Sequence, residues 1–437
     1  MMVIAVFFLA VATGFTRESS ADSEAVYKGL KTFADVIEII EKNYVDPVDT
    51  EKLVQKAIQG MVSSLDPHSL LLPPEEFEDL QIDTKGKFTG IGISISIRDG
   101  FVTVVSPIEG TPAYRAGIKA GDKIVKVDGE SVKDLREAVK MMRGPKGTKV
   151  EVTIVRKGEP EPVVFNLIRD VIPIQSVRAT LLKPGYGYVW VTHFRDKTVQ
   201  DLKKALKKLE KETKGLKGLV LDLRDNPGGL LPQAIKMSDL FLTGGDILSI
   251  KGRLKRHTRS FGAHEDDDDV TCPLVVLING GSASASEIVA GALQDNKRAV
   301  ILGTTSFGKG SVQTVETLRD GYGLKLTIAR YYTPSGRSIQ AKGIEPDITV
   351  YHSILDKQEL AKGEKRMLKE KDLKNHLDAE PDREGDTDKD KKESKKKKER
   401  KKHPGPLDPE RLETDNQVVR ALDILMGYDI LNAARAN

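Results

Sequence analysis

The chain has 437 residues, too many for one hydrophobic core, and its hydrophobic fraction of 39% is that of a globular protein with two or three domains. Its net charge of +4 is concentrated between Ala361 and His403, where 17 Lys or Arg residues accompany 12 Asp or Glu residues. The remainder is close to neutral, which argues against a folded nucleic-acid-binding surface. A single cysteine, Cys272, excludes an intramolecular disulfide and a multi-cysteine metal site.

Residues 1–24 have the pattern of an export segment. Met1–Ala12 are all apolar, and polar sequence begins at Arg17. A membrane-spanning helix needs about 20 apolar residues, so the shorter stretch is closer to the apolar region of a signal peptide. We expect a signal peptide or a membrane anchor, with a buried N-terminal helix as the alternative. The protein is then exported to the periplasm or the cell envelope.

Residues 25–85 carry the spacing of amphipathic helices. One apolar stripe lies within Phe33–Ile40 and a second within Leu53–Met61, each at i, i+3, i+4 spacing. Asp46-Pro47 separates them and Pro73-Pro74 marks the exit. We find no chemistry here and expect a helical scaffold or a homodimerisation element.

Residues 86–170 change to a pattern of short strands. Isoleucine alternates with small residues over Ile91–Ile97, and a turn at Asp99-Gly100 follows. The other expected elements are strands at Phe101–Val105, Ile124–Val127 and Val150–Val155, and a helix at Leu135–Met142. We expect a compact, self-contained module.

Residues 171–357 alternate between strand and helix patterns. The expected strands are Tyr186–Val191, Leu216–Leu223 and Leu274–Asn279, and the expected helices are Val199–Thr213, Leu230–Leu242 and Ala285–Asp295. This alternation predicts an α/β domain with its sites in strand-to-helix loops.

The C-terminal part consists of two segments. Residues 358–404 have few apolar side chains and contain the run Lys395–Lys398, so we expect a charged disordered linker, with a basic tail for anionic partners as the alternative. Residues 405–437 place Val419, Leu422 and Leu425 at the spacing of a final amphipathic helix.

The strongest local signal for chemistry is the small-residue stretch Asn279–Ile288, which lies between an apolar strand and a helix. A turn there exposes a hydroxyl at a helix N-terminus, where the helix dipole and free N–H groups stabilise negative charge. The plain alternative is a serine-rich helix cap.

A serine nucleophile needs a base, and no histidine lies in a comparable setting. The GxSxG motif of the α/β-hydrolases is also absent. If Phe307–Gln313 is extended, Lys309 and Gln313 share one face. Lysine acts as a base only when neutral, so burial must lower its pKa well below the ordinary value. Gln313 would hold the amine by a hydrogen bond without adding charge; an exposed lysine in a glycine turn is the alternative.

Together these motifs resemble those of the carboxy-terminal processing peptidases, or tail-specific proteases. The resemblance makes Ser284 the nucleophile, Lys309 its base and Gln313 the support of the lysine. Another signature of the family matches Ile344–Ile348.

The same resemblance supplies an oxyanion hole and a fold. Asp222–Gly229 looks like the family loop whose last glycine donates an N–H, so Gly229 and the N–H of Ala285 would stabilise the oxyanion. The implied fold is α/β: a crotonase-like (ClpP-like) protease core with an inserted PDZ domain and N-terminal helices. No metal and no cofactor is implied.

The strand-rich module similarly looks like a PDZ domain. Its carboxylate loop would be Gly90, Ile91, Gly92 and Ile93, whose consecutive N–H groups cradle a peptide C-terminus. Arg143 either couples this domain to the active site or lies in a surface turn. The expected partners are protein or peptide substrates with free C-termini, and not nucleic acid.

We therefore expect a serine endopeptidase that cleaves proteins at or near their C-terminal tails. One alternative is a non-catalytic PDZ scaffold on a protease-like core. A second alternative is a hydrolase of small esters or amides on the same core.

Overall fold

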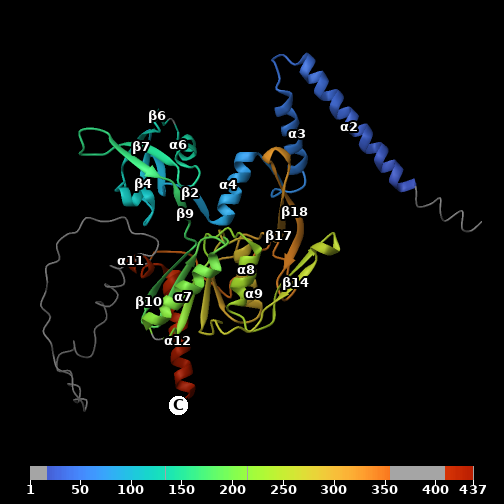
Figure 1. Ribbon diagram of the computed structural model, residues 1–437. Coiled ribbons are helices and arrows are strands. Elements are labelled where there is room, and N and C mark those ends of the chain that lie inside the picture. The colour runs from blue at the N-terminus through green and yellow to red at the C-terminus, as the bar shows by residue number, and fades with distance from the viewer. Residues whose placement is uncertain (1–16, 133, 214, 355–408, 437) are drawn as a thin grey trace, which may run out of the picture. The chain divides into compact units, whose positions relative to one another are not determined.

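The computed structural model describes residues 17–132, 134–213, 215–354 and 409–436 (Figure 1). Most of the expected export segment 1–24 and the expected linker 358–404 lie outside these residues. The chain forms two compact units. The first takes the chain up to Phe77 together with Gln313–Thr327, and the second takes Glu78–Val312 and the chain from Ile328 onward.

The first unit consists of two helices and a strand that pairs with a distant hairpin. Its elements are α2 (Arg17–Asn43), α3 (Thr50–Ser63), β1 (Leu70–Leu72), β17 (Ser311–Thr317), the 3₁₀ turn η2 (Arg319–Gly321) and the start of β18 (Gly323–Tyr332). The β1 strand runs antiparallel to β18, with Leu70 opposite Lys325. Asp49 caps α3 by accepting a hydrogen bond from the N–H of Lys52 at 3.1 Å, which satisfies one free donor of the first turn.

The α2 helix leaves apolar side chains in solvent. The exposed members are Val26, Tyr27, Leu30, Phe33, Val36 and Ile39. In the helices of the described residues, no stretch is both long and apolar enough to cross a bilayer. The exposed side chains give α2 an apolar surface among the residues that the structure describes.

Helix α4 (Pro74–Lys85) leads into a strand-rich module of the second unit. The module consists of β3 (Ile93–Arg98), β4 (Phe101–Pro107), α5 (Pro112–Ala116), β5 (Lys123–Val127), β6 (Glu130–Ser131), α6 (Leu135–Met142), β7 (Lys149–Val155) and β8 (Val163–Ile168). Its sheet has the order β3-β4-β5-β7-β8, and β6 pairs with β5. The chain enters and leaves through adjacent antiparallel strands, β2 (Lys87–Gly90) and β9 (Asp170–Pro173). A module whose two ends lie side by side can be inserted without disturbing the rest of the fold.

The larger part of the second unit is built on a six-stranded sheet of order β10-β11-β12-β15-β16-β19. These strands are β10 (Val177–Lys183), β11 (Tyr186–Val191), β12 (Gly218–Asp222), β15 (Leu274–Ile278), β16 (Val300–Gly303) and β19 (Ile348–Thr349). All neighbours are parallel except β10, which pairs antiparallel with β11. The expected α/β class is confirmed.

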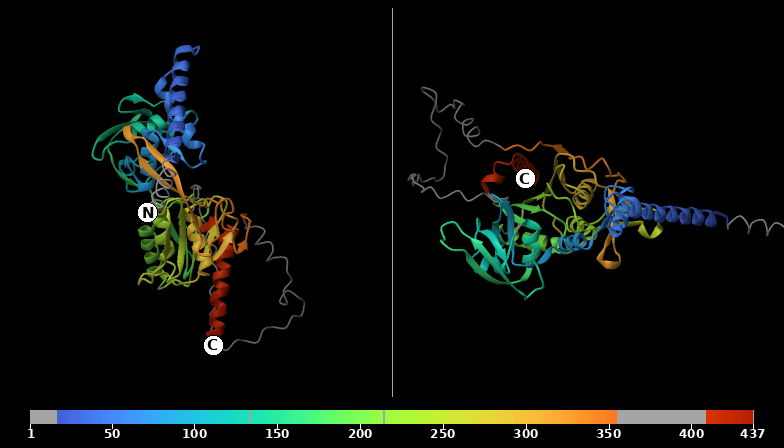
Figure 2. Two further views of the ribbon diagram at one scale, coloured as in Figure 1. Left: turned by 90° about the vertical axis from the view of Figure 1, so that its right-hand side faces the viewer. Right: turned by 90° about the horizontal axis from the view of Figure 1, so that it is seen from above.

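Helices cover both faces of this sheet (Figure 1). On one face pack α7 (Thr198–Thr213), α8 (Leu231–Asp239) and α9 (Ala285–Asp295). The other face is covered by α11 (Pro409–Leu412) and α12 (Asn416–Ala436), the red helix that ends the chain in Figure 2. Successive residues of β12 alternate between the two cores, because Leu219 and Leu221 belong to the first and Val220 to the second.

A small antiparallel arrangement flanks the sheet. It contains β13 (Asp246–Gly252), the 3₁₀ turn η1 (Lys255–His257) and β14 (Arg259–Gly262). The β13 strand pairs with β14 and with Ala329–Tyr332 of β18, which fixes the end of β18 in the second unit.

Candidate active site

The loops that follow β12, β15 and β16 meet at the carboxyl edge of the parallel sheet. This edge is where ligands bind in open α/β sheets. The loop after β12 contains Asp225–Gly229, the loop after β15 contains Asn279–Ser284, and the loop after β16 contains Lys309. The fold therefore brings the three sequence motifs to one edge.

Ser284 occupies a strained position immediately before α9. Its φ of 55° and ψ of −110° are rare for a residue with a side chain. Such strain is typical of nucleophiles held on a sharp strand-to-helix turn. Unlike its neighbours, Ser284 is partly exposed.

The two flanking serines, Ser282 and Ser286, have structural hydrogen bonds to backbone carbonyls. Ser282 and Ser286 are fully buried. The Ser282 hydroxyl donates to the carbonyl of Leu223 at 2.7 Å, and the Ser286 hydroxyl donates to the carbonyl of Asn226 at 2.9 Å. Of the three serines in this stretch, Ser284 is the one that solvent and substrate can reach.

Glu287 joins the serine loop to the lysine loop. One carboxylate oxygen accepts the N–H of Ser284 at 2.7 Å and the N–H of Lys309 at 2.9 Å. The other oxygen accepts the hydroxyl of Ser306 at 2.6 Å and the N–H of Gly308 at 2.7 Å. Burial raises the pKa of Glu287, and these hydrogen bonds oppose that rise. The shared oxygen places the backbones of Ser284 and Lys309 side by side.

Tyr331 closes the same site from β18. Its side chain is buried, and its hydroxyl donates to the carbonyl of Lys309. Burial raises the pKa of the Tyr331 phenol, the charge of Glu287 raises it further, and a hydrogen bond with Ser284 opposes both. Tyr331 therefore contacts both Ser284 and Lys309, which belong to motifs that are separate in the sequence.

A glycine pair faces the start of α9. A Cβ on Gly228 would lie 2.9 Å from the Cβ of Ser284 and 2.9 Å from the nitrogen of Ala285, so only glycine fits. Gly229 has a φ of 140° and passes close to the Phe194 carbonyl. Within the described ranges, neither the N–H of Gly229 nor that of Ala285 donates to a protein acceptor. Both expected oxyanion donors thus lie next to or near Ser284 with their hydrogens unused.

Gln313, by contrast, belongs to the first unit, whereas Ser284 and Lys309 belong to the second. Its amide donates to the hydroxyl of Thr327 at 3.3 Å, and Thr327 donates to Asp66 at 3.1 Å.

A cavity of about 140 Å³ opens in the strand-rich module. Its lining comprises Phe88, Gly90, Ile91, Gly92, Ile93, Ile95, Val139, Met142 and Arg143. The predicted carboxylate loop is thus one wall of an apolar pocket.

Arg143 is the residue that ends α6, and its side chain, which is 35% exposed, lines this pocket. Its guanidinium donates to Asp79 of α4 at 2.7 Å and lies 5.5 Å from the centre of the Phe88 ring. Its Nε is buried and has no hydrogen-bond partner among the residues that the structure describes.

The sequence motifs did not single out Glu287 or Tyr331. For Glu287 a signal exists, since Ser284-x-x-Glu287 fits the capping-box pattern. Tyr331 has no such signal, because its place beside Ser284 depends on the pairing of β18.

Comparison with known proteins matches three stretches of the chain to families. Peptidase family S41 matches residues 185–350, and a PDZ domain matches residues 103–156. The activating protease CtpB N-terminal domain matches residues 10–75.

Similar proteins include two bacterial proteases. The chain is 46% identical over 360 residues to the carboxy-terminal-processing protease of Bartonella bacilliformis, covering 82% of each protein. It is 41% identical over 315 residues to the carboxy-terminal processing protease CtpA of Bacillus subtilis, covering 71% of this chain and 66% of that protein. Among solved structures, the photosystem II D1 C-terminal processing protease is 34% identical, with 73% of this chain and 92% of that one covered and a TM-score of 0.43. With 46% identity sustained over most of both chains, this protein belongs to the carboxy-terminal processing proteases of peptidase family S41 and is a serine-type protease with a PDZ domain.

Proposed function

We propose that the protein is an endopeptidase that uses Ser284 as nucleophile and Lys309 as general base. The observation that carries the proposal is the shared acceptor: one oxygen of Glu287 binds the N–H groups of both residues. Two segments that are separate in sequence are thereby held in one site. The partial exposure and strained backbone of Ser284 support its role as nucleophile.

The proposed reaction is acyl transfer through a covalent intermediate. The neutral amine of Lys309 takes the proton of the Ser284 hydroxyl while the oxygen attacks a peptide carbonyl. The N–H groups of Gly229 and Ala285 stabilise the oxyanion, and the lysine returns its proton to the departing amine. Water then hydrolyses the acyl-enzyme by the same proton path. This scheme needs no metal or cofactor.

Gln313 is proposed to support Lys309 by a hydrogen bond to its amine. A neutral amide suits this role, because a carboxylate at the same place would favour the charged lysine. For the core we propose a crotonase-like (ClpP-like) fold, which its parallel sheet with helices on both faces supports.

Substrates are proposed to be proteins with free C-termini. Gly90, Ile91, Gly92 and Ile93 would bind the terminal carboxylate through backbone N–H groups, with the adjoining apolar pocket holding the last side chain. Capture there raises the concentration of the tethered tail near Ser284, which favours cleavage close to that end.

The chain is proposed to be exported to the periplasm or cell envelope, with residues 1–24 as signal peptide or membrane anchor. We assign residues 25–85 to a helical scaffold, 86–170 to the PDZ domain, 171–357 to the protease core, 358–404 to a charged linker and 405–437 to the final helix. The exposed apolar face of α2 supports a homodimer formed through the scaffold.

The test is incubation of an unfolded model protein with the wild type and with Ser284→Ala, followed by mass spectrometry of the fragments. The wild type should release C-terminal fragments and Ser284→Ala should release none. Ser260→Ala, the same change at an exposed serine of the same core, serves as the control and should cleave normally. Cleavage by Ser284→Ala at the wild-type rate would refute the proposal.

A further inference from the structure

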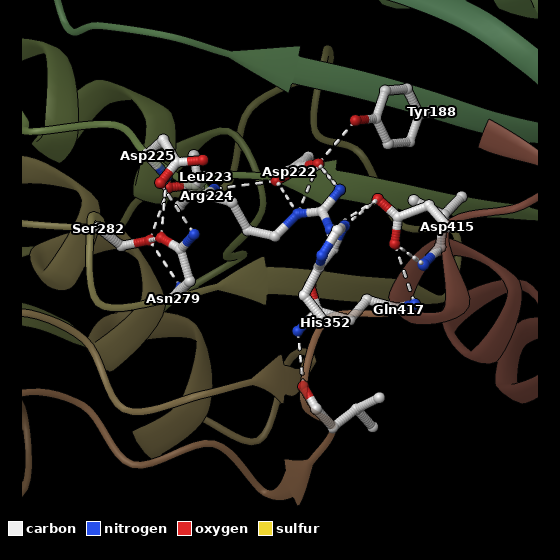
Figure 3. A network of polar contacts seen from close by, with 12 residues as sticks. Tyr188, Asp222, Leu223, Arg224, Asp225, Asn279, Ser282, His352, Asp415 and Gln417 are labelled. Carbon is white, nitrogen blue, oxygen red and sulfur yellow. Dashed lines mark hydrogen bonds and ion pairs between the residues drawn. The ribbon is translucent and has the colours of Figure 1, made fainter. Parts of the chain in front are cut away.

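The last helix of the chain, α12, contacts Arg224, the residue that precedes the loop Asp225–Gly229. Its apolar stripe of Val418, Ala421 and Leu425 packs on the sheet face opposite α9. Asp415 caps the helix, because its carboxylate accepts the N–H of Gln417 at 3.0 Å. The helix start is therefore fixed, and it points polar side chains toward the end of β12 (Figure 3).

Arg224 connects this helix start to β12. Its Nη1 donates to Asp415 at 2.8 Å and to the amide oxygen of Gln417 at 2.7 Å. Its Nη2 donates to Asp222 at 2.6 Å, and Tyr188 donates to the same carboxylate at 2.6 Å. The guanidinium thus bridges the sheet and the C-terminal helix (Figure 3).

The bridge is a buried charge network. The side chain of Arg224 is 11% exposed, that of Asp222 is 2% and that of Asp415 is 12%. Burial works against the charge of Arg224, but the two carboxylates outweigh it and raise the pKa of the guanidinium. A network of this kind is sensitive to the loss of a single member, because an uncompensated charge is left in a low-dielectric environment.

Arg224 is also bound covalently to the loop that carries Gly229. The next residue, Asp225, has a φ of 56° and exchanges hydrogen bonds with Asn279 at 2.9 and 3.0 Å. Asn226 then accepts the N–H of Ala283 at 2.9 Å. Arg224 is therefore continuous with a loop that is hydrogen-bonded to the segment before Ser284.

We propose that Asp415 is a positioning residue, and that the C-terminal helix acts through Arg224 to hold Asp225–Gly229 in its active shape. The inference rests on the proposed function of this loop as part of the oxyanion hole. The final helix is then a component of the active site that acts through Arg224.

The test variant is Asp415→Asn in the full-length protein, since asparagine still caps a helix but carries no charge. We expect kcat to fall about tenfold or more with little change in KM, because small displacements of catalytic groups cost rate rather than binding. Asp423→Asn, the same change at an exposed site of the same helix, is the matched control and should keep wild-type kcat. Wild-type kcat in folded Asp415→Asn would overturn the proposal.

Two further measurements separate positioning from a general loss of structure. Hydrogen exchange of the peptide covering Leu223–Leu230 should be faster in Asp415→Asn and unchanged in Asp423→Asn. Unchanged exchange in both variants would overturn the proposal even if neither variant, nor the wild type, cleaves peptides.

If Asp415→Asn does not fold, Asp415→Ser repeats the comparison with another capping residue. The double variant Asp415→Asn/Arg224→Lys should have the same kcat as Arg224→Lys alone. If the losses of the two single variants add in the double variant, Asp415 does not act through Arg224.

Discussion

Glu287 organises the site at the scale of single residues. It is fully buried, and all four of its partners are donors: three backbone N–H groups and the hydroxyl of Ser306. A carboxylate can accept all of these hydrogen bonds, while any group with a donor of its own cannot. The geometry of Ser284 relative to Lys309 thus depends on the acceptor character of this side chain.

Glu287→Gln is expected to lower kcat by about 100-fold, because the new amide donor faces N–H groups that need an acceptor and the catalytic groups shift. The measurement is kcat on a peptide substrate, with circular dichroism to verify folding. Glu265→Gln, the same change at an exposed position, should leave kcat unchanged. Normal turnover by Glu287→Gln would show that the two loops hold their places without it.

The raised pKa of Glu287 also makes a stability prediction. Because burial lifts its folded-state pKa above the ordinary value of 4.5, the proton favours the folded state. The stabilisation of the folded state by this proton is fully present below the unfolded-state pKa of Glu287 and is lost as pH rises through its folded-state pKa. As pH is raised above about 4.5, the Tm of the wild type should therefore fall relative to the Tm of Glu287→Gln. A Tm difference that is independent of pH, or a wild-type Tm that rises relative to that of Glu287→Gln, would contradict the raised pKa of Glu287.

The sequence supplied part of this residue-scale account. Ser284 and Lys309 belong to local motifs, and their patterns could be recognised without a structure. The partnership of Arg224 with Asp415 could not, since 190 intervening positions hide it and each residue alone resembles an ordinary surface charge. Long-range pairs of this kind depend on how strands and helices pack.

Helices and strands with strong periodicity were predicted well. The expected helix at Leu135–Met142 has those bounds in α6, and the one at Val199–Thr213 begins one residue earlier in α7. The Pro73-Pro74 pair predicts a break, but proline also fits the first turn of a helix, and α4 begins at Pro74. The pairing of β1 with β18 has no signal in the sequence, since it joins residues about 250 positions apart.

Within the described part of the chain, α2 presents an exposed apolar surface. Val36→Asp is expected to convert a dimer into a monomer, because a charge on the apolar face would have to be buried in the interface. Sedimentation velocity at micromolar concentration is the measurement. Lys31→Asp, which changes charge on the same helix away from that apolar set, should remain dimeric. A monomeric wild type would remove the proposed homodimer.

The whole molecule combines a PDZ domain with a protease core, and this combination predicts selectivity for chain ends. Substrates with an apolar free C-terminus should be cleaved faster than the same peptides amidated or ending in Asp, since the amide removes the carboxylate and Asp does not suit the apolar pocket. The comparison uses kcat/KM of paired peptides with the full-length enzyme. Ile93→Asp, which places a charge in that pocket, should reduce the preference. Equal rates for acid and amide would contradict capture of the C-terminus.

In the proposed mechanism, Ser284 becomes the nucleophile because Lys309 activates it. Treatment of the full-length protein with a fluorophosphonate, followed by peptide mapping, tests this most directly. We expect one adduct, on Ser284, and a large loss of labelling in folded Lys309→Ala. An adduct on another residue, or undiminished labelling of Ser284 without Lys309, would contradict it.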